Sequence, residues 1–151
     1  MGVGERGAAK NVTEREDFTQ KTAEQFGRAN DAMMAGDPEP YIEMWSRRDP
    51  VSLFGAWGPC KTGWTQLAET FRWVGSRFSE GENAGVDLDV VYVSGDLAYT
   101  VGYEHAEVSI GGGGKRTIKI RATHIYRRED GEWKIVHRHG DFAPGDESAA
   151  T

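Results

Sequence analysis

The sequence predicts an α+β domain in which helices come first and an antiparallel sheet follows. Apolar residues recur every three or four positions up to about residue 78, which is typical of helices that are packed on one side. From Ala84 onward the period becomes two, and the short turns at 94–96 and 129–131 separate runs long enough to be strands. This order indicates a sheet that is covered by helices on one side.

Length and composition fit one soluble domain, which we expect to span residues 13–142 between flexible tails at 1–12 and 143–151. The net charge of -6 argues against a nucleic-acid partner. The chain has no apolar run long enough for a membrane helix, and its first residues lack the apolar core of a signal peptide. A lone cysteine, Cys60, suits a reducing compartment, so the expected location is cytoplasmic.

The first helix is predicted to begin at Thr13, which forms a capping-box pattern with Glu16. It should run to Ala35, and Gly36 is a fitting stop. Its apolar stripe consists of Phe18, Thr22, Phe26, Ala29 and Met33.

Two further helices are expected before the sheet. Asp37-Pro38 supplies an N-cap residue and a proline at the first helical position for a short second helix. A short strand at 51–54 and a glycine-rich turn at 55–63 follow. The third helix begins at Trp64, with apolar residues at helical spacing up to Phe78.

The remaining strands are predicted at 84–93 and 97–110 and in a closing hairpin at 117–142. Strict alternation in the hairpin predicts two faces. One face would hold the apolar residues and the histidines, namely Ile118, Ile120, Trp133, Ile135, His137, His139 and Asp141. The other would hold the polar set Arg121, Thr123 and Arg138, which we expect to line a hollow beneath the helices.

Several strings resemble the SnoaL-like group of the NTF2-like superfamily, which includes polyketide cyclases and is related to ketosteroid isomerases. The resemblance covers about residues 15–142. The strings are Ala-Gly-Asp at 35–37, residues 45–54, Thr62-Gly63, Gly-Asp-Leu-Ala-Tyr at 95–99 and Asp-Gly-Glu-Trp-Lys-Ile-Val-His-Arg-His at 130–139. The last string is also similar to the association domain of calcium/calmodulin-dependent protein kinase II, which has this fold and assembles the holoenzyme.

The resemblance implies a cone, in which a curved antiparallel sheet wraps on three N-terminal helices and encloses a pocket. It also implies a homodimer through the outer sheet face, a small hydrophobic or carboxylate-bearing ligand, and no cofactor. The catalytic residues of the isomerases are not carried over. Leu53 or Phe54 stands at the position of their aspartate base, Ala29 at or beside their tyrosine, and Thr123 at their buried acid. The cyclases carry an aspartate on their last strand, and Arg138 is the residue of this chain that stands nearest to that position.

Arg121 and Arg138 are the first candidates for chemistry. Two guanidinium groups on the same side of neighbouring strands would hold a carboxylate or an enolate, with Thr123 beside them. The alternative is that they pair across the sheet with Asp87, Asp89 or Glu104.

Tyr99, Tyr103 and His105 alternate on one strand. If that side faces the hollow, Tyr103 is a hydrogen-bond donor, His105 is a general acid or base, and Tyr99 contacts substrate. The alternative places Tyr103 in the core and His105 near a solvated strand end. Trp45 and Trp57 are expected at the pocket mouth, where they would stack on a ligand.

His137, His139 and Asp141 have a spacing that brings alternate strand residues onto one face, and His124 would complete a metal site. Hydrogen bonding at a subunit interface is the preferred interpretation, so no metal is expected. The predicted function is that of a small-molecule pocket protein, as a cofactor-independent isomerase, cyclase or lyase acting on a hydrophobic carbonyl compound. The alternative is a non-catalytic ligand-binding or dimerisation module.

Overall fold

The computed structural model describes the backbone of residues 3–143 and the side chains of residues 14–143. This part of the chain contains three helices and six strands. They are α1 (Val3–Met34), α2 (Glu39–Glu43), β1 (Ser52–Phe54), β2 (Cys60–Thr62), α3 (Trp64–Ser76), β3 (Phe78–Ser94), β4 (Leu97–Ile110), β5 (Arg116–Glu129) and β6 (Glu132–Phe142).

Helix α1 begins at Val3, ten residues before the start predicted at Thr13. The segment before Thr13 contains alanine, glutamate, arginine and lysine, which are compatible with a helix, so the capping pattern alone does not set the start. The predicted apolar stripe of α1 is buried. Residues 1–2 and 144–151 of the predicted tails lie outside the described residues.

Aspartate side chains outside the two shorter helices accept hydrogen bonds from the first N–H group of each helix. The Asp37 carboxylate accepts a hydrogen bond of 3.1 Å from the Glu39 N–H at the start of α2. Asp49 does the same for the Trp64 N–H at the start of α3, also at 3.1 Å. These bonds satisfy donors that a helix start leaves without a partner, and they fix where both helices begin.

The sheet has the order β2-β1-β6-β5-β4-β3. Its pairs are antiparallel except for β1 with β6, which is parallel. Two details differ from the sequence prediction. The turn expected at 55–63 contains the short strand β2, and β3 begins at Phe78 instead of Ala84. The predicted α+β architecture is otherwise confirmed.

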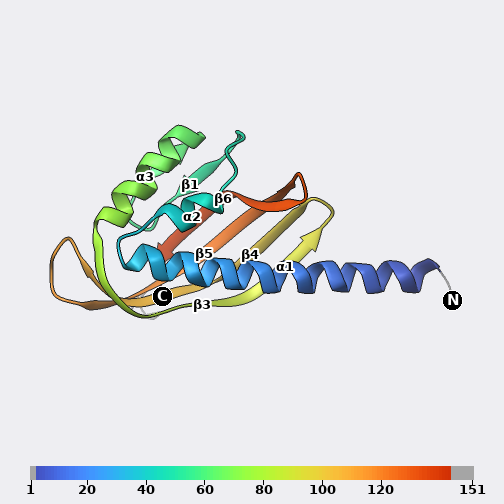
Figure 1. The fold of residues 1–151 in the computed structure, drawn as a ribbon, viewed down its shortest axis with the longest axis horizontal. Helices are drawn as coiled ribbons and strands as arrows, with labels where there is room; N and C mark the ends of the chain where they lie inside the picture. The colour runs from blue at the N-terminus through green and yellow to red at the C-terminus, as the bar shows by residue number, and fades with distance from the viewer. Residues whose placement is uncertain (1–2, 144–151) are drawn as a thin grey trace, which may run out of the picture.

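The helices lie on one side of the sheet, and the N-terminal part of α1 projects beyond the strands (Figure 1). We call the side that faces the helices the inner face and the opposite side the outer face. On β5 the inner face carries Ile118, Ile120, Ala122, His124 and Tyr126, all of them buried. The core therefore lies between this face and the helices.

A β-bulge at Val136 changes the alternation in β6. Ile125 of β5 pairs with His137, whereas the next residue, Tyr126, pairs with Ile135, so Val136 has no opposite residue. Ile135 is buried on the inner face before the bulge, and Arg138 is buried on the same face after it. The expected single face from Trp133 to Asp141 is therefore split at Val136, because strict alternation does not survive an inserted residue.

Candidate functional site

A cavity of about 60 Å³ lies between the helices and the inner face. One water molecule requires roughly 10–15 Å³ by this kind of measure, so the cavity has room for several small atoms. Its walls are apolar except for a few polar side chains. The lining residues are Phe26, Ala29, Asn30, Met33, Met34, Tyr41, Leu53, Gly55, Ala56, Trp57, Pro59, Thr70, Phe71, Val74, Phe78, Glu104, Ile120 and Arg138.

Arg138 and Glu104 form a buried ion pair at one end of the cavity. Nη2 of Arg138 donates to Oε1 of Glu104 at 2.8 Å, and Nη1 donates to Oε2. Burial, the largest single influence, lowers the pKa of Arg138, but the charge of Glu104 together with Tyr41 and the hydrogen bonds to both raises this pKa overall. The guanidinium is therefore charged and its charge is neutralised within the pair.

His124 connects this ion pair to Tyr41 of α2. Its Nε2 lies 3.2 Å from Nη1 of Arg138 and 2.8 Å from the Tyr41 hydroxyl. Burial, followed by the nearby Arg138 charge, lowers the pKa of His124 well below its usual value, so the ring is neutral. A guanidinium can only donate, so Nε2 is the acceptor and Nδ1 carries the proton.

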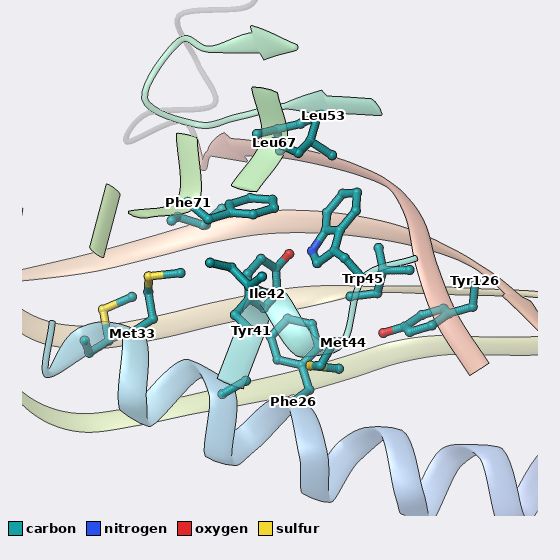
Figure 2. Close-up of a cluster of buried hydrophobic side chains, with 14 of the residues drawn as sticks. Phe26, Met33, Tyr41, Ile42, Met44, Trp45, Leu53, Leu67, Phe71 and Tyr126 are labelled. Carbon is teal, nitrogen blue, oxygen red and sulfur yellow. The ribbon is translucent and has the colours of Figure 1, made fainter. Parts of the chain in front are cut away.

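The Tyr41 hydroxyl is held as a protonated donor. Burial raises its pKa to about 12. Its ring packs edge-on against Phe71 with centroids 5.1 Å apart. Figure 2 shows the indole nitrogen of Trp45 on the side of the indole that faces this hydroxyl. That nitrogen is buried and makes no hydrogen bond within the described part of the chain.

Close packing on β6 gives Arg138 its place. Gly140 follows on the same face, and a Cβ atom there would lie 2.9 Å from Nη2 of Arg138. Such a contact is shorter than normal packing allows, so a glycine at 140 leaves the space that the guanidinium fills. The backbone of β6 thus orients Arg138 toward Glu104.

Arg121 and Thr123 lie on the outer face, so the prediction that they share a face with Arg138 is wrong. Arg121 makes a bidentate ion pair with Asp141, with both N–O distances at 2.7 Å. Thr123 stands opposite His139. The cause is the bulge at Val136, which places Arg138 opposite His124 instead of an outer residue. The alternative, in which the arginines pair with Asp87, Asp89 or Glu104, is confirmed for Arg138, whose partner is Glu104. It is wrong for Arg121, whose partner is Asp141.

Tyr99, Tyr103 and His105 also lie on the outer face, because Glu104 between the last two is buried on the inner face. The expectation that this side faces the hollow is wrong. The Lys119 ammonium lies 4.4 Å above the Tyr103 ring, and His105 is 3.3 Å from the Asp87 carboxylate on a solvated part of the strand.

The two tryptophans predicted at the mouth have different positions. Trp57 lines the cavity. Trp45 is 1% exposed and packs on Phe71 with ring centroids 5.1 Å apart, behind the lining residues. Trp57 is therefore the one that a bound molecule would meet.

The outer face has a shallow hollow of about 280 Å³ that brings together Tyr103, Arg121 and Thr123 with His139 and Asp141. His137 lies nearby, and its Nδ1 is 2.7 Å from the Ser52 hydroxyl. Across residues 14–143, no three His, Cys, Asp or Glu side chains gather in an arrangement that would hold a metal ion.

We take the inner cavity as the candidate site, although the outer hollow is larger. The inner cavity is enclosed by apolar side chains, and perturbed ionisable groups meet at its end. Sequence reasoning did not select Tyr41, Asn30, Glu104 and His124 as a group. A signal for His124 existed, since it alternates with Ile118, Ile120 and Ala122.

None of the described helices is long and apolar enough to cross a membrane. Several solved structures have the same fold. An NTF2-like superfamily protein from Salmonella enterica serovar Typhimurium matches with a TM-score of 0.71 and 21% identity, over 87% of this chain and 96% of that chain.

Two other structures are similar at comparable distance. A candidate dehydratase of the NTF2-like family from Streptomyces avermitilis has a TM-score of 0.65 and 21% identity, over 84% of this chain and 99% of its own. A candidate calcium/calmodulin-dependent protein kinase II association domain from Xanthomonas campestris has a TM-score of 0.63 and 20% identity, over 83% of this chain and 88% of its own. At these identities the similarity establishes the fold alone.

No curated protein sequence matches the chain. The family model for the SnoaL-like domain matches residues 23–143, which include both arms of the closing hairpin and the helices that cover the cavity. This match spans most of the 151 residues and agrees with the observed fold. The chain belongs to the SnoaL-like domain family.

Proposed function

We propose that the protein binds a small, mainly apolar molecule in the inner cavity and recognises one neutral oxygen group of that molecule. The observation that carries this proposal is the contrast within the cavity, where apolar walls lead to the linked side chains of Tyr41, His124, Arg138 and Glu104. Sites for small molecules combine apolar walls with a few fixed polar groups in this way.

Tyr41 is the group best placed to contact the ligand. Its hydroxyl and Nη1 of Arg138 both approach Nε2 of His124. The hydroxyl can therefore rotate toward a ligand carbonyl while His124 keeps a donor, and no buried polar atom loses its partner. A ligand carbonyl oxygen would accept this hydrogen bond inside an apolar enclosure.

A catalytic role on a hydrophobic carbonyl compound, as a cofactor-independent isomerase, cyclase or lyase, is the second candidate. The hydrogen bond of 2.8 Å between Tyr41 and His124 favours it. Donation from Tyr41 would stabilise the negative charge that forms on a carbonyl oxygen when the neighbouring carbon loses a proton. Among the described residues that line the cavity, Glu104 alone has a carboxylate to take that proton. The dehydratase assignment of one structural neighbour falls in the lyase class.

Calorimetric titration with cyclohexanone and 1,3-cyclohexanedione tests the binding proposal. We expect Tyr41→Phe to weaken binding about three- to ten-fold, the usual value of one hydrogen bond. Tyr103→Phe is the matched control, because it removes the same hydroxyl from the outer face, and it should leave the affinity unchanged. Equal losses in the two variants would refute the assignment of the inner cavity.

Proton exchange at the α-carbon of the same ketones in deuterated water, followed by NMR, separates binding from catalysis. Exchange that depends on Tyr41 supports the catalytic candidate. Binding without any acceleration of exchange supports a ligand-binding protein.

The outer face supports a further proposal, that two copies of the chain associate through it. Its exposed apolar side chains include Phe54, Tyr92, Tyr99 and Ile125, which are 37–53% exposed. Apolar groups that gather on one sheet face are typical of a protein contact. Sedimentation at micromolar concentration tests this proposal, and a mass of one chain would contradict it.

A further inference from the structure

A surface groove continues the inner cavity toward solvent. Trp57, Val74 and Phe78 line both the cavity and a groove of about 270 Å³. The remaining walls of the groove are Trp73, Arg77, Ile110 and Arg116. A molecule whose body occupies the cavity would therefore extend one end into this groove.

Two arginines give the groove a positive charge. Arg77 follows α3 and Arg116 begins β5, and neither forms an ion pair with any residue of the described chain. The neighbouring Lys115 differs, because Glu82 neutralises it at 2.7 Å. The groove residues include no acid. In a chain of net charge -6, this is a local reversal of sign.

Each arginine side chain contacts a neighbouring residue. The Arg77 side chain lies against Gly111, leaving no room there for a side chain, and the Gly111 N–H donates to the Arg77 carbonyl at 2.7 Å. Arg116 lies over the Trp57 ring at 6.0 Å from its centroid. Side chains that are already placed lose less conformational freedom when they bind an anion.

The arginine at the inner end of the cavity, unlike the two in the groove, is already neutralised. Glu104 already neutralises Arg138, so a ligand carboxylate placed there would be buried without a free cation. Tyr41 beside it offers a neutral donor. A charged group on the ligand is therefore disfavoured at the inner end and favoured in the groove.

We infer that the ligand of the cavity is amphiphilic, with a neutral oxygen at Tyr41, an apolar body, and an anionic group held between Arg77 and Arg116. This inference rests on the binding role proposed for the cavity. The anionic group is a carboxylate, sulfonate or phosphate, since each accepts hydrogen bonds from guanidinium groups, and both arginines line the groove. The exposed aromatic wall formed by Trp73, 53% exposed, would cover the part of the ligand between body and charge.

Calorimetric titration with matched probes tests the inference. The probes are phenylacetate, 3-phenylpropanoate and 4-phenylbutanoate, each compared with its uncharged amide. We expect the acids to bind more tightly than the amides, with an advantage that decreases as salt is added. The double variant R77Q/R116Q should weaken binding of the best acid about five-fold, as for exposed charge pairs, and leave the amide unchanged.

Two further variants control for net charge and for folding. K21Q/R28Q removes two positive charges from the exposed side of α1 and should bind the acids like the wild type. R77K/R116K keeps both charges and should retain most of the affinity for the acids.

Equal affinity of the wild type for acids and amides would overturn the anionic end and leave the cavity proposal standing. Failure of every acid and amide to bind would overturn the cavity proposal as well. Higher affinity of R77Q/R116Q for the acids would also overturn the inference.

Discussion

The two faces of the sheet carry the same interaction in different surroundings. On the inner face Arg138 pairs with Glu104, and their side chains are 10% and 8% exposed. On the outer face Arg121 pairs with Asp141, and both side chains are 46% exposed. Both contacts are bidentate. The two pairs have the same chemistry, and they differ in whether helices pack over them. Packing of the helices, more than residue type, therefore decides which arginine belongs to an enclosed site.

The largest expected effect comes from breaking the inner pair. Glu104→Gln leaves the Arg138 charge buried without a counter-charge, which should lower the free energy of unfolding by about 3–5 kcal/mol. Urea unfolding measures the loss. The matched variant Asp141→Asn breaks the outer pair and should cost much less, because water screens that contact.

A companion variant sharpens this comparison. Glu104→Gln combined with Arg138→Met removes both charges and should recover a large part of the lost stability. Similar losses for Glu104→Gln and Asp141→Asn would contradict the contrast between the faces.

The second largest effect is a loss of stability at acidic pH. The pKa of His124 is lowered, chiefly by burial, below the value near 6.5 that it has in the unfolded chain. Below pH 6.5 the unfolded chain therefore binds more protons than the folded one at this site. We expect the free energy of unfolding to fall by about 1.4 kcal/mol for each pH unit below 6.5 because of this residue. Above pH 6.5 the neutral His124 costs the folded state nothing in this respect.

Unfolding measured between pH 7.5 and pH 5 tests this expectation, in the range where histidines titrate. The slope should become shallower in His124→Gln and remain as in the wild type in His139→Gln, whose ring lies on the outer face. A wild-type slope in His124→Gln would show that the buried ring does not titrate as described.

The smallest change in the free energy of unfolding is expected on the outer face. Ile125→Asp places a charge among exposed apolar side chains and should change the free energy of unfolding of each chain by no more than about 0.5 kcal/mol. It should nevertheless reduce the mass in sedimentation from two chains to one. Trp73→Asp removes an exposed aromatic residue from α3 and should leave the mass unchanged.

The fold could be predicted from the sequence because its signals are local. The helical stripe of α1, the aspartate before α2, and the turn at 129–131 each act over a few residues. The start of α1 could not be placed, since favourable helix propensity continues upstream of Thr13. The strand β2 was missed because three exposed residues in a glycine-rich loop have no apolar pattern.

The site was harder to predict for a different reason. Arg138 and Trp57 were selected correctly as cavity residues, but Tyr103, His105 and Arg121 were assigned to the wrong face. For Arg121 the error arises because the register shift in β6, which separates its face from that of Arg138, is invisible in the residue pattern. For Tyr103 and His105 the alternation along β4 predicted a shared face but not which face the helices cover. The groups that surround Arg138 come from α2, β4 and β5, and only the folded chain brings them together.

The bulge at Val136 has a consequence for how such a site changes over evolution. Loss of that single codon would restore even spacing in β6 and leave Ile135 and Arg138 on the inner face, because every other residue keeps its partner on β5. Loss of the bulge with Val136 retained would instead turn His137 and His139 toward the helices and Arg138 toward solvent. Sequence comparisons within this family should therefore accept a one-residue gap before Arg138 without inferring a change in the chemistry of the cavity.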